Sequence, residues 1–296
     1  MNAIFQMPRL IVVLVFSGLL TQASAQYGEW KHSGSMYLVT TSAGANLPAS
    51  AVEKNFPLLV RINENYFDFS QAKPRGEDIR FSSNGKPLAY QIEHWDAAGG
   101  NAHIWVRIPT IKGNDQQAIK MHWGNDKASS ESNGEQVFQT SQGFAGVWHL
   151  GDNLLDATSN NLDGFNRPDK PTTNTSGIIG DAQEFGINKF LVVRPPGARR
   201  DRRVTCMPSG NADRTMSAWV NPKNFESHNW AQASIGGWGE PERGQKPNMG
   251  LSYFTMTGRG QPRFHLYGFD PRCASTLRRN QWGHIALSVS ENTVRF

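Results

Sequence analysis

Short segments of alternating apolar and polar residues, separated by turn-forming residues, constrain this chain more than any other feature. In residues 90–95 (YQIEHW), every second side chain points to the same face of an extended strand. Turn residues such as Asn84-Gly85 and the run at 98–101 separate these segments. Long helical periodicity is absent, and proline, glycine and tryptophan are frequent. The pattern predicts an all-β fold made of sandwiches of short strands.

Residues 27–142 are expected to form the first of two β-sandwich modules. Along residues 90–95, strict alternation is expected to place Glu93 on the side of Trp95, away from His94 and Asp96. The predicted strands of this module are residues 36–41, 56–62, 79–82, 88–95, 103–108 and 118–123.

Residues 1–25 have the three parts of a secretory signal peptide. Arg9 gives a basic start, residues 10–20 are almost wholly apolar, and Ala23-Ser24-Ala25 has the small side chains of a cleavage site. The apolar run is shorter than the roughly 20 residues that cross a bilayer, although an uncleaved anchor is the alternative. No later segment is apolar enough to span a membrane. We therefore expect export to the periplasm, to the extracellular space or to the cell surface.

The stretch at residues 144–164 (FAGVWHLGDNLLDATSNNLDG) is predicted to join the two modules. An apolar run ends there, and a cluster of Asp, Asn, Ser and Gly begins. Without the leader, about 270 residues are left, which is enough for two domains. The second module is therefore placed at residues 144–296.

The first module resembles the bacterial domain of unknown function 2341. The resemblance covers most of residues 30–150 and keeps the order of the segments, but that family has no established activity. It rests on residues 56–60 (FPLLV), 78–81 (DIRF), 88–95 (LAYQIEHW), 103–109 (HIWVRIP), 121–125 (MHWGN), 137–138 (VF) and 144–150 (FAGVWHL).

The second module is similar to concanavalin A-like lectin/glucanase (laminin-G-like) domains. This resemblance implies a two-sheet jelly roll. Because further strands usually follow the last similar segment, we expect an incomplete jelly roll that lacks its last strands. Some relatives continue into a proton-channel segment of the TolQ/ExbB type. The similar segments are residues 156–164 (DATSNNLDG), 177–185 (GIIGDAQEF), 216–222 (MSAWVNP) and 281–287 (QWGHIAL).

Aromatic and polar residues of the second module suggest a carbohydrate site, which needs an aromatic platform and a few polar groups. Alternation along residues 263–267 places the odd-numbered side chains on one face, opposite Phe264 and Leu266. Trp219 and Trp282 are expected in the core. The predicted ligand-binding residues are Trp238, Arg263, His265 and Tyr267.

Asp156, Asn161 and Asp163 could bind calcium as a cofactor. Their side chains supply the hard oxygen ligands that calcium accepts. The spacing differs from that of an EF-hand loop, and the same residues form Asx turns without a metal. Both interpretations stay open at this point.

Two further groups of residues leave alternatives open. Cys206 and Cys273 could pair in an exported protein, but the sequence does not set the distance between them, and neither has the spacing of a zinc ligand. Part of the net charge of +5 comes from the arginine-rich segment at residues 194–203. This segment would attract anionic groups or form a solvated loop tip. Nucleic acid is not expected as a partner, because no nucleic-acid-binding motif is present.

The sequence contains no recognisable catalytic constellation. Between residues 216 and 296 only Glu240 and Glu242 have alternate spacing, and they flank Pro241 in a Gly- and Pro-rich segment. Nucleophile-elbow, HExxH and phosphate-loop motifs are absent. We therefore predict an exported non-catalytic protein that binds extracellular or envelope carbohydrate. The alternatives are a structural or adhesion module that contacts envelope protein, and a glycoside hydrolase or polysaccharide lyase.

Overall fold

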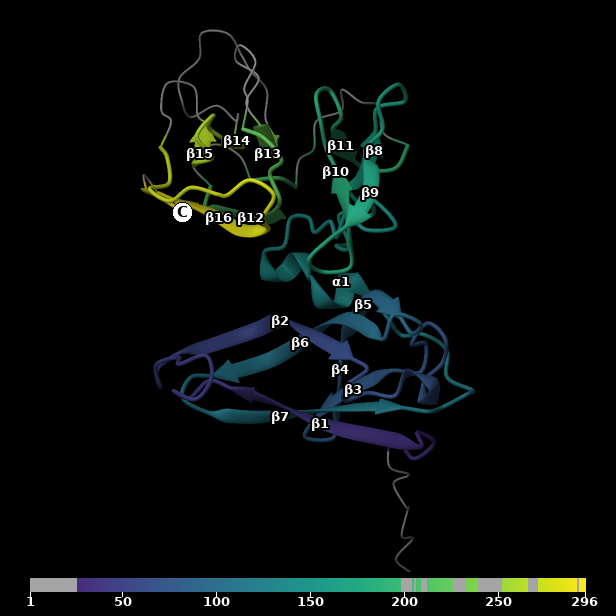
Figure 1. The fold of residues 1–296 in the computed structure, drawn as a ribbon. Helices are drawn as coiled ribbons and strands as arrows, with labels where there is room; N and C mark the ends of the chain where they lie inside the picture. Colours follow the sequence, from purple (N-terminus) through teal and green to yellow (C-terminus); the bar gives the residue numbers. More distant parts are fainter. Residues whose placement is uncertain are drawn as a thin grey trace, which may run out of the picture.

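The computed structural model describes residues 26–197, 204, 206–208, 212–225, 233–238, 252–265, 271–291 and 293–296. Nearly all regular structure in these ranges is antiparallel β-sheet, so the predicted all-β sandwich fold is confirmed (Figure 1). The predicted signal peptide, residues 1–25, lies outside the described residues. Among the residues that are described, no helix has the length and apolar character needed to cross a membrane.

Two antiparallel sheets pack face to face in the first module (Figure 1). Their strand orders are β1-β7-β3-β4 and β2-β6-β5. The predicted segment at residues 88–95 spans two strands, because the chain passes from one sheet to the other at Ala89. The strands are β1 (His32–Val39), β2 (Val52–Asn63), β3 (Arg80–Ser83), β4 (Lys86–Leu88), β5 (Tyr90–Asp96), β6 (Asn101–Lys112) and β7 (Gln116–Trp123).

Alternation along β6 builds the core of the first module. Ala102, Ile104, Val106 and Ile108 are buried, and the residues between them lie on the outer face of their sheet. The buried set packs against side chains of the other sheet, including Phe81. Each fully buried aliphatic or aromatic side chain stabilises the fold by about 1.5–3 kcal/mol. This core holds the β2-β6-β5 sheet in place beneath the second module.

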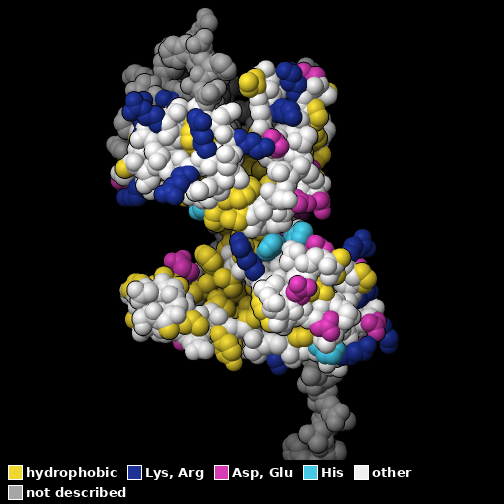
Figure 2. Space-filling view, in the orientation of Figure 1, with side chains coloured by type: hydrophobic (Ala, Val, Ile, Leu, Met, Phe, Trp, Pro, Cys, Tyr) yellow, Lys and Arg dark blue, Asp and Glu magenta, His cyan; other side chains and the backbone are white. Residues whose placement is uncertain are grey.

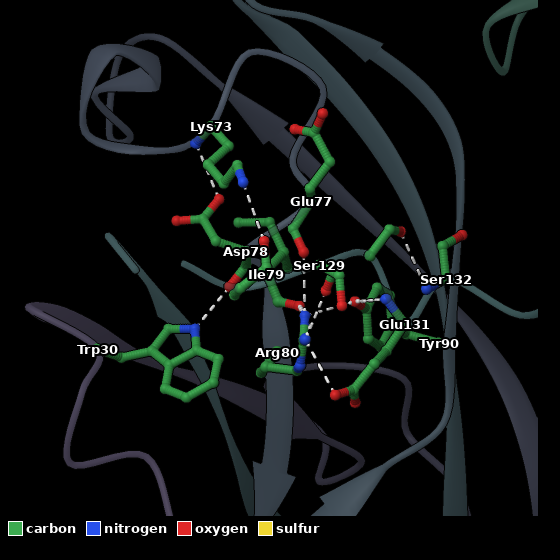
Figure 3. A network of polar contacts seen from close by, with 12 residues as sticks. Trp30, Lys73, Glu77, Asp78, Ile79, Arg80, Tyr90, Ser129, Glu131 and Ser132 are labelled. Carbon is green, nitrogen blue, oxygen red and sulfur yellow. Dashed lines mark hydrogen bonds and ion pairs between the residues drawn. The ribbon is translucent and has the colours of Figure 1, made fainter. Parts of the chain in front are cut away.

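A buried polar network ties β3 to the loops beside it (Figure 3). Asp78 has no exposed surface. Its Oδ1 accepts a hydrogen bond from the Lys73 backbone N–H at 2.8 Å, and its Oδ2 accepts bonds from Gly124 N at 2.6 Å and Asn125 N at 3.1 Å. The Asp78 carbonyl oxygen accepts a bond from Trp30 Nε1 at 2.6 Å. The carboxylate thus fixes two loops, and the backbone carbonyl of the same residue holds the segment just before β1.

Arg80 extends the same network to the opposite side of β3 (Figure 3). Its Nη1 donates to the carbonyl oxygen of Ile79 at 2.7 Å and to Tyr90 Oη at 3.1 Å. Its Nη2 donates to Ser129 O at 2.7 Å and pairs with the Glu131 carboxylate at 2.9 Å. These contacts hold the segment that follows β7 against the core.

The described part of the second module contains four small antiparallel sheets. Two are strand pairs, β8 with β11 and β9 with β10, and two have three strands, in the orders β12-β16-β17 and β13-β14-β15. The strands are β8 (Asp163–Asn166), β9 (Thr173–Ser176), β10 (Asp181–Glu184), β11 (Leu191–Arg194), β12 (Arg214–Val220), β13 (Ala233–Trp238), β14 (Ser252–Met256), β15 (Pro262–His265), β16 (Gly283–Ser290) and β17 (Thr293–Arg295).

The two three-stranded sheets form a sandwich around a second core. Phe254 and Phe264 from one sheet pack with Ile285, Leu287 and Val289 of β16 in the other. The alternation along β16 leaves its remaining side chains on the outer face of the sheet. That outer face carries the candidate site described below.

The segment that joins the modules covers the outer face of the β2-β6-β5 sheet. It includes α1 (Gly134–Val137) and the short 3₁₀ helix η2 (Thr140–Gln142); another 3₁₀ helix, η1 (Phe69–Gln71), follows β2. Val137, Phe138 and Ala157 form a small buried cluster with Trp105 and Phe144. The Trp105 and Phe138 rings meet edge to face at 5.6 Å between centroids. Residues before the predicted joint and residues within it therefore pack on the first module.

Candidate ligand-binding surface

Trp219 lies on the outer face of the β12-β16-β17 sheet. Its side chain is 43% exposed, so the prediction that it belongs to the core is wrong. Met216, Ala218 and Val220 alternate with it and take the inner side of β12. Trp219 is paired across the strands with His284, and the two ring centroids are 5.0 Å apart. Trp282, the other predicted core tryptophan, is half-buried.

Small side chains surround this pair of rings. Thr215 Oγ1 and Ser288 Oγ lie 3.1 Å apart on the same face, and Ser217 is paired with Ala286 between them and Trp219. We call the outward side of β12 and β16, formed by these residues, the Trp219 face. Apart from His284, the side chains beside Trp219 on this face are small. They leave part of the flat indole ring exposed next to hydroxyl groups. This arrangement suits a sugar ring, which has an apolar C–H face and a polar edge.

Of the four predicted ligand-binding residues, the structure describes the side chains of Trp238 and Arg263, and these two do not share one exposed face. Trp238 is half-buried, and its Nε1 donates to Pro208 O at 2.6 Å. Arg263 is only 9% exposed and is paired across the strands with Thr255. Strand register places Trp238 on the Phe254 side of the sheet and Arg263 on the opposite side. The side chain of His265 and the whole of Tyr267 lie outside the described residues.

Asp156 uses its carboxylate to fix the joint. Its Oδ1 accepts hydrogen bonds from the backbone N–H groups of Val147 at 2.9 Å and Thr158 at 3.0 Å. Its Oδ2 accepts bonds from Thr158 Oγ1 at 2.9 Å and Leu162 N at 3.0 Å. The bond from Thr158 N is the Asx turn of the metal-free interpretation.

The other two predicted calcium ligands serve the same turn. Asp163 Oδ1 accepts a bond from Asp156 N at 3.0 Å, and Asn161 Nδ2 donates to Ser159 O at 3.0 Å. Asn161 has a φ of 50°, which asparagine tolerates better than most residues. Within the described ranges, no group of three or more His, Cys, Asp and Glu residues is arranged to hold a metal ion.

A buried carboxylate, Glu93, lies beneath the joint. Its side chain is 8% exposed, accepts a hydrogen bond from Trp105 Nε1, and lies 3.0 Å from His149 Nδ1. The Nε2 atom of His149 lies 2.9 Å from Gln91 Oε1. Glu93 therefore faces the joint, and the prediction that it shares the face of Trp95 is wrong. A β-bulge between Ile92 and His94 adds one residue and shifts the alternation.

A turn of the second module docks on two histidines of the first. The backbone N–H of Gly180 donates to His103 Nδ1 at 3.1 Å, and Arg61 Nη2 lies 3.5 Å from Ile178 O. The His94 and His103 rings are 5.6 Å apart. A Cβ atom at position 180 would lie 3.0 Å from His94 Cβ, and Gly180 has a φ of 61°. Figure 2 shows histidine side chains at this boundary between the modules.

The docking of this turn is expected to weaken as the pH falls. His103 Nδ1 accepts a hydrogen bond, so that atom must carry no proton. Burial, with Arg61 and His94 nearby, lowers the pKa of His103, and Glu93 opposes this only in part. Since the unfolded chain then binds more protons, the contribution to stability is complete above about pH 6.5 and is lost as the pH falls towards the folded-state pKa. The protection of the Gly180 amide against hydrogen exchange, relative to its intrinsic exchange rate at each pH, should therefore fall between neutral and mildly acidic pH.

The control for this experiment is His103→Gln. This variant should lose that pH dependence of Gly180 exchange, whereas His284→Gln, which changes an exposed histidine on another sheet, should keep it. Exchange at Gly180 that responds to pH equally in wild type and His103→Gln would contradict the assignment.

A groove of about 540 Å³ lies on the first module beside α1. Its walls include Arg107, Glu131 and Ser132. Ser132 Oγ accepts a bond from Ile92 N at 2.9 Å, Arg107 Nη1 donates to Gln139 Oε1 at 2.5 Å, and Glu131 pairs with Arg80. These polar groups already hold β5 and the segment that follows β7 in place, which makes the groove a structural feature of the first module.

Cys206 and Cys273 are free thiols in the structure. Cys206 is exposed, Cys273 is half-buried, and partial burial raises the pKa of the Cys206 thiol. The arginines at positions 199, 200, 202 and 203 and the carboxylates of Glu240 and Glu242 lie outside the described residues.

Comparison with known families identifies part of the first module. Residues 75–151 match the domain of unknown function 2341. The match begins just before Asp78 and ends after His149, so it contains the Arg80 network and the Glu93 cluster. It covers less than half of the chain, and it supports the resemblance stated for the first module. None of the curated proteins and none of the solved structures matches the chain significantly.

Proposed function

We propose that this chain is an exported, non-catalytic protein that binds extracellular or envelope carbohydrate through the Trp219 face. The observation that carries the proposal is the exposed indole of Trp219 beside His284, on a sheet face of small hydroxyl side chains. The C–H face of a sugar ring would stack on the indole, and its hydroxyl groups would bond to Ser217, Ser288 or the imidazole. Export follows from the signal-peptide features of residues 1–25.

The lectin-like segments of the sequence support this location. Residues 216–222 and 281–287 resemble concanavalin A-like domains, and they form β12 and the start of β16, which pair with each other. Two of the four similar segments thus build the Trp219 face. We propose that the second module is a lectin-like jelly roll on this basis, together with its two packed three-stranded sheets.

Binding fits this face better than hydrolysis does. The described residues on the outer sides of β12 and β16 offer indole, imidazole and hydroxyl groups. Glycoside hydrolases of the common type place two carboxylates across the scissile bond, and the outward side chains of these two strands include none. Figure 2 shows the surface hollowed between the modules, and Figure 1 places β12 and β16 on the side of the second module towards β2. A glycan on the Trp219 face would lie along this hollow.

Trp219→Ala is expected to weaken glycan binding by at least about tenfold, because it removes the stacking surface. A glycan-array screen with and without calcium would identify a ligand, and titration calorimetry would measure its affinity for wild type and variant. Tyr37→Ala is the matched control, since Tyr37 is an exposed aromatic on β1 of the first module.

Equal affinity of wild type and Trp219→Ala for the identified glycan would exclude the Trp219 face. If a folded wild-type protein binds no glycan on the array, the carbohydrate proposal fails and contact with envelope protein becomes the favoured function. Thermal denaturation of each variant would establish that it is folded.

A further inference from the structure

Two hairpin turns of the second module emerge together. The turn at residues 167–172 connects β8 to β9, and the turn at residues 185–190 connects β10 to β11. The pairing of Asn166 with Leu191 and of Thr173 with Glu184 brings both turns to one end of their sheets. The Arg167 guanidinium lies over the Phe190 ring, 5.6 Å from its centroid. We call these two turns the hairpin tip.

The hairpin tip exposes three large apolar side chains. Ile187 is 78% exposed, more than any other large apolar side chain in the described part of the chain. Phe185 is 48% exposed and Phe190 is 37% exposed. The turn that carries Ile187 is tight, since Lys189 N donates to Gly186 O at 2.9 Å and Asn188 has a φ of 61°. Several large apolar side chains exposed on neighbouring turns, unlike a single one, commonly mark a contact surface.

Positive charge surrounds these apolar groups. Arg167 pairs with Asp169 at 2.8 Å, and Lys223 pairs with Glu184 at 2.6 Å. Hydrogen bonds from Arg167 and Lys223 lower the pKa values of Asp169 and Glu184, and the nearby charges of Lys170 and Lys189 lower them further. Among the described residues of the hairpin tip and its ion pairs, cationic side chains therefore outnumber acidic ones. Figure 2 shows hydrophobic, basic and acidic side chains together at the end of the second module that points away from the first.

We propose that the hairpin tip docks on the surface of an anionic lipid bilayer. Ile187, Phe185 and Phe190 would enter the boundary between headgroups and acyl chains, and Lys170 and Lys189 would contact the phosphates. Exposed apolar side chains with cations nearby complement such a surface in both charge and polarity. The hairpin tip and the Trp219 face are formed by different strands, so this inference does not depend on carbohydrate binding.

Sedimentation with vesicles would test the proposal. The full chain should sediment with vesicles that contain phosphatidylglycerol and much less with vesicles of phosphatidylcholine alone, and salt should reduce the bound fraction. Ile187→Asp should lower the partition coefficient by at least about tenfold. Each of Lys170→Gln and Lys189→Gln should lower it by about fivefold. Residues 1–25 are identical in all variants, so the comparison reports on the hairpin tip.

Leu155→Asp is the matched control, because Leu155 is a 57% exposed apolar residue of the same module outside the hairpin tip. It should bind vesicles as wild type does. A direct measurement uses Ile187→Cys in a Cys206→Ser, Cys273→Ser background, labelled with an environment-sensitive fluorophore. Its emission should shift to the blue on phosphatidylglycerol vesicles and stay unchanged on phosphatidylcholine vesicles.

Three results would overturn the proposal. The first is equal sedimentation of wild type and Ile187→Asp, and the second is a label at position 187 that shows no spectral shift on anionic vesicles. The third is concentration-dependent self-association without lipid that Ile187→Asp abolishes, which would make the hairpin tip a contact between two copies of this chain.

Discussion

Asp78→Ala is expected to lower the free energy of unfolding of the first module by about 3–5 kcal/mol. The carboxylate is fully buried and accepts hydrogen bonds from three backbone N–H groups on two loops. Removing it leaves the amides of Lys73, Gly124 and Asn125 buried without their acceptor. Urea denaturation followed by circular dichroism would measure the loss as a lower midpoint with an unchanged slope.

Asp78→Asn sharpens this test. The two carboxylate oxygens accept from opposite sides, whereas an amide presents one oxygen and one NH₂ group. The amide must therefore turn a donor towards a backbone donor, and we expect Asp78→Asn to lose most of what Asp78→Ala loses. Asp126→Ala is the control, because Asp126 is a highly exposed partner of Lys31 and should leave the midpoint unchanged. Retention of wild-type stability by Asp78→Ala would contradict this role of the network.

The first core could be predicted from the sequence because its strands alternate regularly. The predicted strand at residues 103–108 falls inside β6, whose alternate residues are the buried ones. Two features could not be predicted. The bulge between Ile92 and His94 inserts one residue and carries Glu93 to the joint, and the change of sheet at Ala89 interrupts no alternation. Both are decided by what packs against the strand, which local pattern does not encode.

The exposure of Trp219 was indicated by the local sequence, although tryptophan is usually buried. In residues 215–220 (TMSAWV), the alternation puts Trp219 on the side of Thr215 and Ser217, opposite three apolar residues. The general tendency of tryptophan to be buried favoured the core instead. The position of His284 beside Trp219 could not be predicted, because it depends on the pairing of β12 with β16, which lie far apart in the chain. The exposure of Ile187 is also indicated by the local sequence, because Gly186 and Asn188 on either side of it are turn-forming residues.

Asp156→Ala is expected to destabilise the joint by about 3–5 kcal/mol, in the presence of calcium or of a chelator alike. The carboxylate is 7% exposed, and its two oxygens accept four hydrogen bonds from Val147, Thr158 and Leu162. A calcium ion would need the lone pairs that these donors occupy. Wild type should therefore melt at the same temperature with calcium and with chelator, since only a ligand that binds the folded state raises it.

Asn161→Gly separates the two interpretations of this cluster. Glycine keeps the positive φ of position 161 and removes only the side chain, whose amide donates to Ser159 O. If the cluster works through hydrogen bonds alone, this variant should melt close to wild type, while Asp156→Ala melts far below it. If calcium raises the melting temperature of wild type and both substitutions abolish that rise, the three residues form a metal site. In that case the lone pairs of Asp156 must be released from Val147 and Leu162 when the ion binds, and the hydrogen exchange of those two amides should accelerate in calcium.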